Sequence, residues 1–427
     1  MLCVSSGKGI KKIHSQKEVL NKNFKLMYMK FFKVNVFILG FTMLIVSCSS
    51  VKKEKDVKHI DEILSSNTIK VKAALKDLKT FDSFPRTISK NHSKWEQVGL
   101  KDWCSGFWPG VLWYAYEFSG DQDLKQAAEN FTTPLKTIAY SKALDHDIGF
   151  QIYNSYGNGY RLTGNPEYKK VLLAAADTLA TLYNPIVGSI HSWPMKPQYP
   201  HNTIIDNMIN LELLFWAAKH GGSKRLYDIA ESHAEVSMKH LVRPDYSTYH
   251  LGSFDDKTGA FIRGVAHQGY ADDSMWARGQ TWGIYGFAFT YRETGREDFL
   301  KTAIGLADKF LERLPEDGMP FWDFDDPKIP NAPKDASAAA VAACGLLDLS
   351  GLVKDARLKE TYFNAAKRFI DILSSDAYLS KNNNQALLLH STGHHPKNSE
   401  IDVPIIYADY YFMEALLRLR QLELNKE

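Results

Sequence analysis

Residues 103–131 read WCSGFWPGVLWYAYEFSGDQDLKQAAENF and contain the unit on which the fold is built. The first half is rich in aromatic and small residues and carries almost no charge, which is typical of a helix buried on all sides. FSGD then places Gly120 where a helix C-cap requires a left-handed residue. The segment after it has apolar residues at helical spacing opposite a polar face. This stretch therefore predicts a hairpin of one inner and one outer helix.

The same unit recurs along the chain. Further helix-ending turns read LTGN, KHGG, ETGR and LSGL, and their glycines are Gly164, Gly221, Gly295 and Gly351. Six weakly charged segments are predicted as inner helices: residues 103–118, 146–162, 203–218, 274–291, 336–349 and 403–420. Six amphipathic segments are predicted as outer helices: residues 61–78, 121–131, 165–183, 223–241, 296–314 and 355–373. The turns are 44 to 74 residues apart, too uneven for a tetratricopeptide array with its ~34-residue period. The pattern predicts an all-α fold, the (α/α)6 barrel or six-hairpin toroid.

Charge and linker composition suggest how the chain is divided. Residues 57–427 hold the repeat without a Pro-, Gly- or Ser-rich linker, so we expect one barrel domain there. The chain has a formal charge of +3, but residues 1–47 contain eight Lys and one Glu. The rest carries 44 basic and 48 acidic side chains. This balance gives no support to nucleic-acid binding.

The N-terminal residues 1–47 predict an upstream extension and a signal peptide. MKFFKVNVFILGFTMLIVSC, residues 29–48, has a basic start and an apolar run too short for a comfortable membrane span. Its end resembles a bacterial lipobox, which implies cleavage before Cys48 and lipid attachment to that thiol, with residues 48–56 as a polar tether. We expect a lipid anchor in the bacterial outer membrane, on either side, and the choice between Met1 and Met29 as the start of translation stays open. An ordinary secretory signal is the alternative.

The remaining cysteines and the motif content predict neither a disulfide nor a metal. Cys104 and Cys344 lie 16 and 7 residues before their turns, which puts them at heights that differ by roughly 13 Å in the barrel. A disulfide does not bridge that distance. No CxxC or HExxH motif is present, and we expect no metal site and no cofactor.

Unusual polar and aromatic residues of the inner helices lie at one predicted level. Counted back from the glycine turns, they precede them by 15 to 17 residues: Trp103, Asp147, Asp206, Arg278 and Asp335. They should therefore ring the barrel mouth opposite the turns. Long loops lead to the same mouth, carrying Trp193, His250, His267, Gln268, Trp322, His394 and His395. A funnel of aromatics, carboxylates and an arginine suits a small acidic sugar.

Each of these aspartates also has a purely structural interpretation. Asp is a favoured N-cap, so Asp147, Asp206 and Asp335 can each be a cap and nothing more. Asp206 fits this least well, because TIIDNMINLELLFWAA places it in an otherwise apolar inner helix. Asp335 follows a Pro-rich loop and fits it best. A single loop histidine is as often a hydrogen-bonding group as a catalytic one.

Four motifs together resemble glycoside hydrolase family 88, the unsaturated glucuronyl hydrolases. They are DWCSGFWPG at 102–110, HDIGF at 146–150, IDNMIN at 205–210 and HQGYADDSMWARGQTWGIYG at 267–286. The resemblance covers roughly residues 60–425 and implies the (α/α)6 barrel. It also implies that Asp206 is the general acid and base and Asp147 the second carboxylate. The family's substrate-binding positions match His250, Gln268, Arg278, Trp276, Trp103 and Trp193.

The resemblance further implies an unusual glycosidase reaction. The substrate is an oligosaccharide left by a polysaccharide lyase, with a 4,5-unsaturated uronic acid at its non-reducing end. Protonation at C4 and addition of water at C5 give a hemiketal that opens and releases the next sugar. Asp206 would then need a raised pKa, which burial and Asp147 are expected to provide. Arg278 is expected at the substrate's carboxylate, away from Asp206.

Three other functions remain open at this stage. One is an unsaturated rhamnogalacturonyl hydrolase of family 105, and a second is a lyase or epimerase on the same barrel. The third is a lipid-anchored protein that binds glycans without catalysis, although such a protein has no need for buried carboxylates. Ser391 and Lys397 do not settle whether sulfated substrates are preferred, and the source polysaccharide is also open.

Overall fold

The computed structural model describes residues 22, 24–27, 56–381 and 384–425. It separates into one unit of Ile60–Asn425 and another of Met1–His59 with Lys426–Glu427. The described residues of the latter are helical. Cys48, where lipid attachment is expected, and nearly all of the expected leader and tether lie outside the described residues. No helix in the described part of the chain is both long enough and apolar enough to cross a bilayer.

A closed ring of inner helices forms the centre of the larger unit. Each of these helices packs against the next, and the last packs against the first. In chain order they are α2 (Phe107–Ser119), the π-helix η3 (Gly149–Gly157) continued by α5 (Asn158–Thr163), α7 (Asn207–Lys219), α9 (Ala277–Thr294), α11 (Ala336–Leu352) and α13 (Ile406–Leu424). This closure confirms the predicted barrel.

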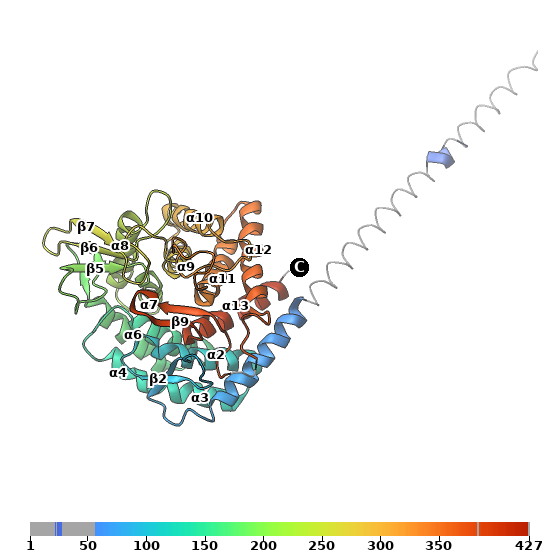
Figure 1. Ribbon diagram of the computed structural model, residues 1–427, viewed down its shortest axis with the longest axis horizontal. Helices are drawn as coiled ribbons and strands as arrows, with labels where there is room; N and C mark the ends of the chain where they lie inside the picture. Colours follow the sequence, from blue (N-terminus) through green and yellow to red (C-terminus); the bar gives the residue numbers. More distant parts are fainter. Residues whose placement is uncertain (1–21, 23, 28–55, 382–383, 426–427) are drawn as a thin grey trace, which may run out of the picture. The chain divides into compact units, whose positions relative to one another are not determined.

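Outer helices cover the ring on its outside, as the labels at the rim of Figure 1 show. They are helical residues 60–74, α3 (Gln122–Thr132), α6 (Pro166–Ala180), α8 (Lys224–His240), α10 (Glu297–Glu312) and α12 (Ala356–Leu373). Several begin with a side-chain N-cap immediately after the turn; Asp121 and Asp355, for example, each accept two backbone N–H groups. One apolar core runs between the two layers.

Four of the five predicted glycine turns have the expected geometry. Gly120, Gly164 and Gly295 are left-handed C-caps with φ of 67–69°, and Gly221 has φ of 103°. The prediction for Gly351 is wrong. Gly351 lies inside α11, which ends at Leu352 with the extended residue Val353 as its C-cap, so no left-handed residue is needed.

Short helices and antiparallel strands occupy the connections. The helices are η1 (Trp103–Gly106), η2 (Thr133–Leu135), α4 (Lys136–Ala139) and η4 (His395–Lys397). The paired strands are β1 (Ser83–Thr87) with β2 (Glu96–Gly99), β3 (Tyr183–Asn184) with β4 (Ser189–Ile190), and β8 (Ser391–His394) with β9 (Ser399–Val403). A three-stranded sheet has the order β5 (His201–Ile204), β6 (Leu251–Phe254) and β7 (Phe261–Val265). The elements from β4 to β7, and β8, η4 and β9, belong to the long loops that the sequence predicted at one mouth.

The second inner helix begins as a π-helix whose first turn is bonded to α7. The Phe150 N–H donates to Asn210 Oδ1 of α7 at 2.8 Å. A Cβ on Gly149 would lie 2.4 Å from the same oxygen, so only glycine lets α7 approach this closely. N–H groups in the first turn of a helix have no partner within the helix, so Asn210 satisfies a donor that would otherwise be unpaired. The π-helix starts two residues after Asp147.

Two glycine substitutions test this assignment of the turns. Gly295→Ala should destabilise the protein by roughly 1 kcal/mol, because φ of 69° disfavours a Cβ although nothing lies within 4 Å of it. Gly351→Ala should stabilise the protein by up to about 1 kcal/mol, because Gly351 is helical and equally unobstructed. Urea unfolding of both variants measures the difference. Equal destabilisation would contradict the assignment of Gly351 to the helix.

Candidate active site

A cavity of about 380 Å³ lies at the N-terminal ends of the inner helices. Loops and helices contribute to its lining together, as expected from the counting of residues back from the turns. The lining includes six of the eight residues put forward for catalysis or substrate binding: Trp103, Asp147, Trp193, Asp206, Gln268 and Arg278. The other two, His250 and Trp276, lie behind the wall, with ring centroids 4.6 Å apart. A direct contact of either ring with substrate stays a prediction.

Asp206 stands at the start of α7 but does not cap that helix. Its backbone is helical and its carboxylate accepts no capping hydrogen bond, so the cap interpretation is wrong for this residue. Oδ2 is buried and has no hydrogen-bond partner among the described residues. Burial raises the pKa of Asp206 to about 7, against an opposing effect of the Arg278 charge. Arg278 is thus close enough to act on Asp206, contrary to the expected separation.

Asp147 is the second carboxyl group of the cavity. Burial raises its pKa well above the ordinary value, and the charges of Asp145, Asp206 and Asp102 raise it further. The charge of Asp147 was expected to raise the pKa of Asp206. The structure shows the reverse effect, because the charge of Asp206 raises the pKa of Asp147. Asp147 therefore favours its protonated form more strongly than a solvated carboxyl group does, and the pKa of about 7 leaves Asp206 poised between its two forms at neutral pH.

Each of these carboxyl groups faces one buried histidine. His146 Nε2 is 3.3 Å from Asp147 Oδ1, and His250 Nε2 is 3.5 Å from Asp206 Oδ2. Burial lowers the pKa of His146 to about 4 and that of His250 well below its ordinary value. Both rings are therefore neutral at neutral pH.

The backbone partners of the two rings assign opposite tautomers. His146 Nδ1 lies 3.0 Å from the Ser192 carbonyl, which only accepts, so Nδ1 carries the proton and Nε2 is an acceptor toward Asp147. His250 Nδ1 accepts from the Gln268 N–H at 3.0 Å, so its proton is on Nε2, toward Asp206. The arrangement favours a protonated Asp147 and offers a donor to an ionised Asp206.

Arg278 is bound on one side by the protein. Its Nη1 donates to Asp335 at 2.8 Å and to the Thr392 carbonyl at 2.6 Å, and its Nη2 donates to the Gly393 carbonyl at 2.6 Å. At most two of its five N–H groups remain for a ligand. Asp335 also caps α11 by accepting from the Ser337 N–H, so the predicted cap is confirmed. The prediction did not include the second role of Asp335 as the ion-pair partner of Arg278.

Residues at the outer wall include a cation that the sequence analysis missed. Lys196 Nζ lies 3.5 Å from the Trp193 ring centroid and 2.9 Å from His267 Nε2. Burial lowers the pKa of Lys196 to about 8 and that of His267 to about 3. His394 completes this cluster against His267, with ring centroids 5.0 Å apart. No motif marks Lys196 in SIHSWPMKPQYPHN; only its place in a long loop is a signal.

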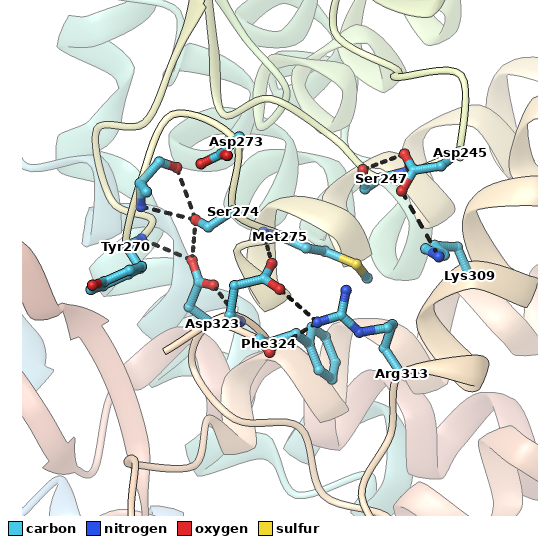
Figure 2. Close-up of polar contacts among 12 residues, drawn as sticks. Asp245, Ser247, Tyr270, Asp273, Ser274, Met275, Lys309, Arg313, Asp323 and Phe324 are labelled. Carbon is cyan, nitrogen blue, oxygen red and sulfur yellow. Dashed lines mark hydrogen bonds and ion pairs between the residues drawn. The ribbon is translucent and has the colours of Figure 1, made fainter. Parts of the chain in front are cut away.

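The loop that carries Gln268 into α9 is held from beneath by a buried carboxylate (Figure 2). Asp323 Oδ2 accepts from the Tyr270 N–H at 2.8 Å and from the Ser274 hydroxyl at 2.7 Å. Asp323 is fully buried, and these bonds satisfy an oxygen that would otherwise be costly to desolvate. The network fixes the loop where it enters α9 and thereby supports Gln268.

Comparison with known proteins decides the family. The model of Glycosyl Hydrolase Family 88 matches residues 72–420. The chain belongs to this family. An unsaturated glucuronyl hydrolase of Formosa agariphila is 40% identical over 94% of this chain and 100% of its own length. One of Bacillus sp. (strain GL1) is 37% identical over 81% of this chain and 93% of its own.

Solved structures agree with the family assignment. A crystal structure of an unsaturated glucuronyl hydrolase specific for heparin has a TM-score of 0.82 at 40% identity, over 86% of this chain and 98% of the other. The enzyme of Bacillus sp. GL1 has a TM-score of 0.79 at 34% identity, over 84% and 96%. The family 88 resemblance of the four motifs is confirmed, and the chain is a glycosidase.

The buried Asp206 predicts a stability that depends on pH. Because its pKa is higher in the folded than in the unfolded chain, its contribution is complete below about pH 4 and is lost as pH rises through about 7. Asp206→Asn should therefore be more stable than wild type at pH 8, by on the order of 2 to 4 kcal/mol, and this difference should shrink to about half at pH 5. Calorimetry at both pH values measures this, with the exposed Asp376→Asn as control. A pH-independent difference would contradict the shift.

Proposed function

We propose that this family 88 enzyme removes a 4,5-unsaturated uronic acid from the non-reducing end of oligosaccharides left by polysaccharide lyases. The observation that carries the proposal is the Asp206 carboxyl group, which lines the cavity, has one oxygen without a hydrogen-bond partner among the described residues, and has a pKa of about 7. A group that donates a proton and then takes one back works best when its pKa is near the working pH.

The first step transfers the proton of Asp206 to C4 of the sugar. The C4=C5 electrons form the new C–H bond, and the positive charge is shared by C5 and the ring oxygen. The carboxylate left on Asp206 is stabilised by the His250 Nε2–H and the nearby Arg278 charge. Asp147, whose pKa burial raises well above its usual range, lies in the same wall.

The second step adds water at C5. The Asp206 carboxylate accepts a proton from the water as the oxygen bonds to C5, which regenerates the acid. The resulting hemiketal opens by cleavage of the bond between C5 and the ring oxygen, and the hemiacetal at C1 then releases the next sugar. No nucleophile attacks the anomeric carbon, so the spacing rule for paired glycosidase carboxylates does not apply.

The rest of the cavity fits the shape and charge of such a sugar. Trp103 and Trp193 provide aromatic faces in the wall. Lys196 and the free side of the Arg278 guanidinium provide positive charge for the uronate carboxylate. These contacts support the substrate class and leave the source polysaccharide to be measured.

Replacement of the acid tests the mechanism directly. Asp206→Asn should lower kcat by about 10² to 10⁴-fold, because the amide cannot donate a proton to carbon. Loss of the ultraviolet absorbance of the double bond measures the rate, with unsaturated disaccharides from chondroitin, heparin and ulvan lyases as substrates. Asp376→Asn, which changes an exposed loop carboxylate paired with Lys381, is the control and should retain wild-type rates. Near-wild-type activity of Asp206→Asn would exclude it as the acid, and appearance rather than loss of absorbance would indicate a lyase.

We also propose that Cys48 carries a lipid that anchors the enzyme in the bacterial outer membrane. The support is the short apolar run and the Ile45-Val46-Ser47-Cys48 sequence. The full chain expressed in a Gram-negative host should enter the detergent phase of a Triton X-114 extract, and Cys48→Ser should leave it. Cys3→Ser is the matched control and should remain in the detergent phase. Detergent partition that is unaffected by Cys48→Ser would contradict the anchor.

A further inference from the structure

A second cavity, of about 350 Å³, lies inside the barrel at the end where the glycine turns are. The later halves of several inner helices form its wall, as Tyr114 of α2, Trp216 of α7 and Glu414 of α13 show. No residue of its lining also lines the catalytic cavity. The mechanism above makes no use of it.

Aromatic side chains close the barrel between the two cavities. Trp282 contacts Phe150 and Tyr411, with ring centroids 5.4 Å away in both cases. Phe107 contacts the same two rings, at 5.6 and 6.0 Å. These four residues, which we call the aromatic plug, come from α2, η3, α9 and α13 and are at most 1% exposed. The second cavity is therefore a separate compartment.

Polar atoms in the wall of the second cavity lack partners. The Tyr411 hydroxyl and Asn154 Nδ2 are buried and have no hydrogen-bond partner among the described residues. Tyr411 is 1% and Asn154 6% exposed, and both line the cavity. Buried donors of this kind are nearly always satisfied by protein, water or ligand. They therefore indicate that a hydrogen-bonding molecule enters the cavity.

Charged groups in the same wall already have partners of opposite sign. Arg161 pairs with Glu117 at 2.6 Å, and the Glu414 carboxylate with Arg418 at 2.6 Å. The remaining carboxylate of the wall, Glu212, is 3.0 Å from the Arg292 guanidinium. A charged ligand would have to compete with these pairs and lose its own hydration. The wall thus favours an uncharged ligand.

Aromatic rings make up much of the remaining surface and reach the rim. Trp216 is half-buried, stacks on His220 with centroids 4.2 Å apart and meets the Tyr160 ring edge-on at 5.4 Å. Trp and Tyr rings offer apolar faces together with polar edges. Such rings, combined with amide and hydroxyl groups, match a molecule that has both C–H faces and several hydroxyl groups.

We propose that the second cavity binds a small uncharged saccharide. Apolar sugar faces would lie on the aromatic wall, while hydroxyl groups would satisfy Tyr411 and Asn154. Ligand pockets of a few hundred cubic ångströms with aromatic walls and a few polar groups are typical of small-molecule sites. The site is independent of the catalytic one, because the aromatic plug separates them.

Calorimetric titration of the full chain tests the proposal. D-glucose, N-acetyl-D-glucosamine and L-rhamnose are the probes, and at least one should bind at millimolar concentration. D-glucuronate is the charged counterpart of D-glucose, and it should bind to the second cavity roughly tenfold more weakly than D-glucose or not at all. Its binding there is the part that Trp216→Ala removes, because the catalytic cavity can bind a uronate by itself. Absence of binding by all three neutral sugars, or D-glucuronate binding that Trp216→Ala weakens as much as that of D-glucose, would overturn the proposal.

Variants at the two ends of the barrel locate the bound sugar. Trp216→Ala and the isosteric Glu212→Gln should each weaken sugar binding, the former by roughly tenfold or more, without changing the rate of double-bond loss. Trp193→Ala, in the catalytic wall, should leave sugar binding intact. Circular dichroism shows whether each variant is folded. If Trp216→Ala is unstable, Glu212→Gln provides the test, because it keeps the shape of the wall. Sugar binding that is lost in Trp193→Ala but kept in the other two variants would place the sugar in the catalytic cavity and overturn the proposal.

Discussion

The ion pair between Arg278 and Asp335 is the interaction on which the chemistry of the site depends. Both side chains are at most 1% exposed, and the pair lies directly beneath the catalytic cavity. A lone guanidinium at this position would hold Asp206 in its ionised form and remove the acid. Asp335 and the carbonyls of Thr392 and Gly393 share that charge, so burial remains the larger effect on Asp206. The cation is thus close enough to stabilise the carboxylate formed after proton transfer.

A raised pKa alone does not mark a catalytic aspartate in this molecule. Burial raises the pKa of Asp409 to about 7 as well, the same value as for Asp206. Both oxygens of Asp409, however, accept backbone N–H groups, from Leu387 and Leu388, and hold the chain there. Asp206 has an oxygen without a partner and opens into a cavity. Geometry therefore distinguishes a group that reacts from one that supports the fold.

Much of the fold could be predicted from sequence because it depends on local signals. Left-handed glycines end the inner helices at one level, so distances counted back from them placed Asp206 and Arg278 at the same mouth. The exception was Gly351, which lies within α11 and does not end it. The helix ends at Leu352, and the extended residue Val353 follows it. The π-helix was not predicted, nor was the bond that joins its first turn to α7, because Phe150 and Asn210 are 60 residues apart and no local pattern connects them.

The site was less predictable, because it depends on contacts between distant loops. The partners that set the protonation of Asp147 and the position of Lys196 come from loops whose paths no periodicity specifies.

The aromatic plug also depends on contacts between distant residues, and it limits how a saccharide chain can enter the active site. Because the plug closes the barrel behind the active site, a saccharide chain cannot pass through the barrel from one end to the other. Only a chain end can enter, and the released sugar must leave by the same mouth before another end is admitted. Each lyase-generated oligosaccharide carries one unsaturated end, so one sugar is removed from each chain, and the shortened product must leave by the way it entered.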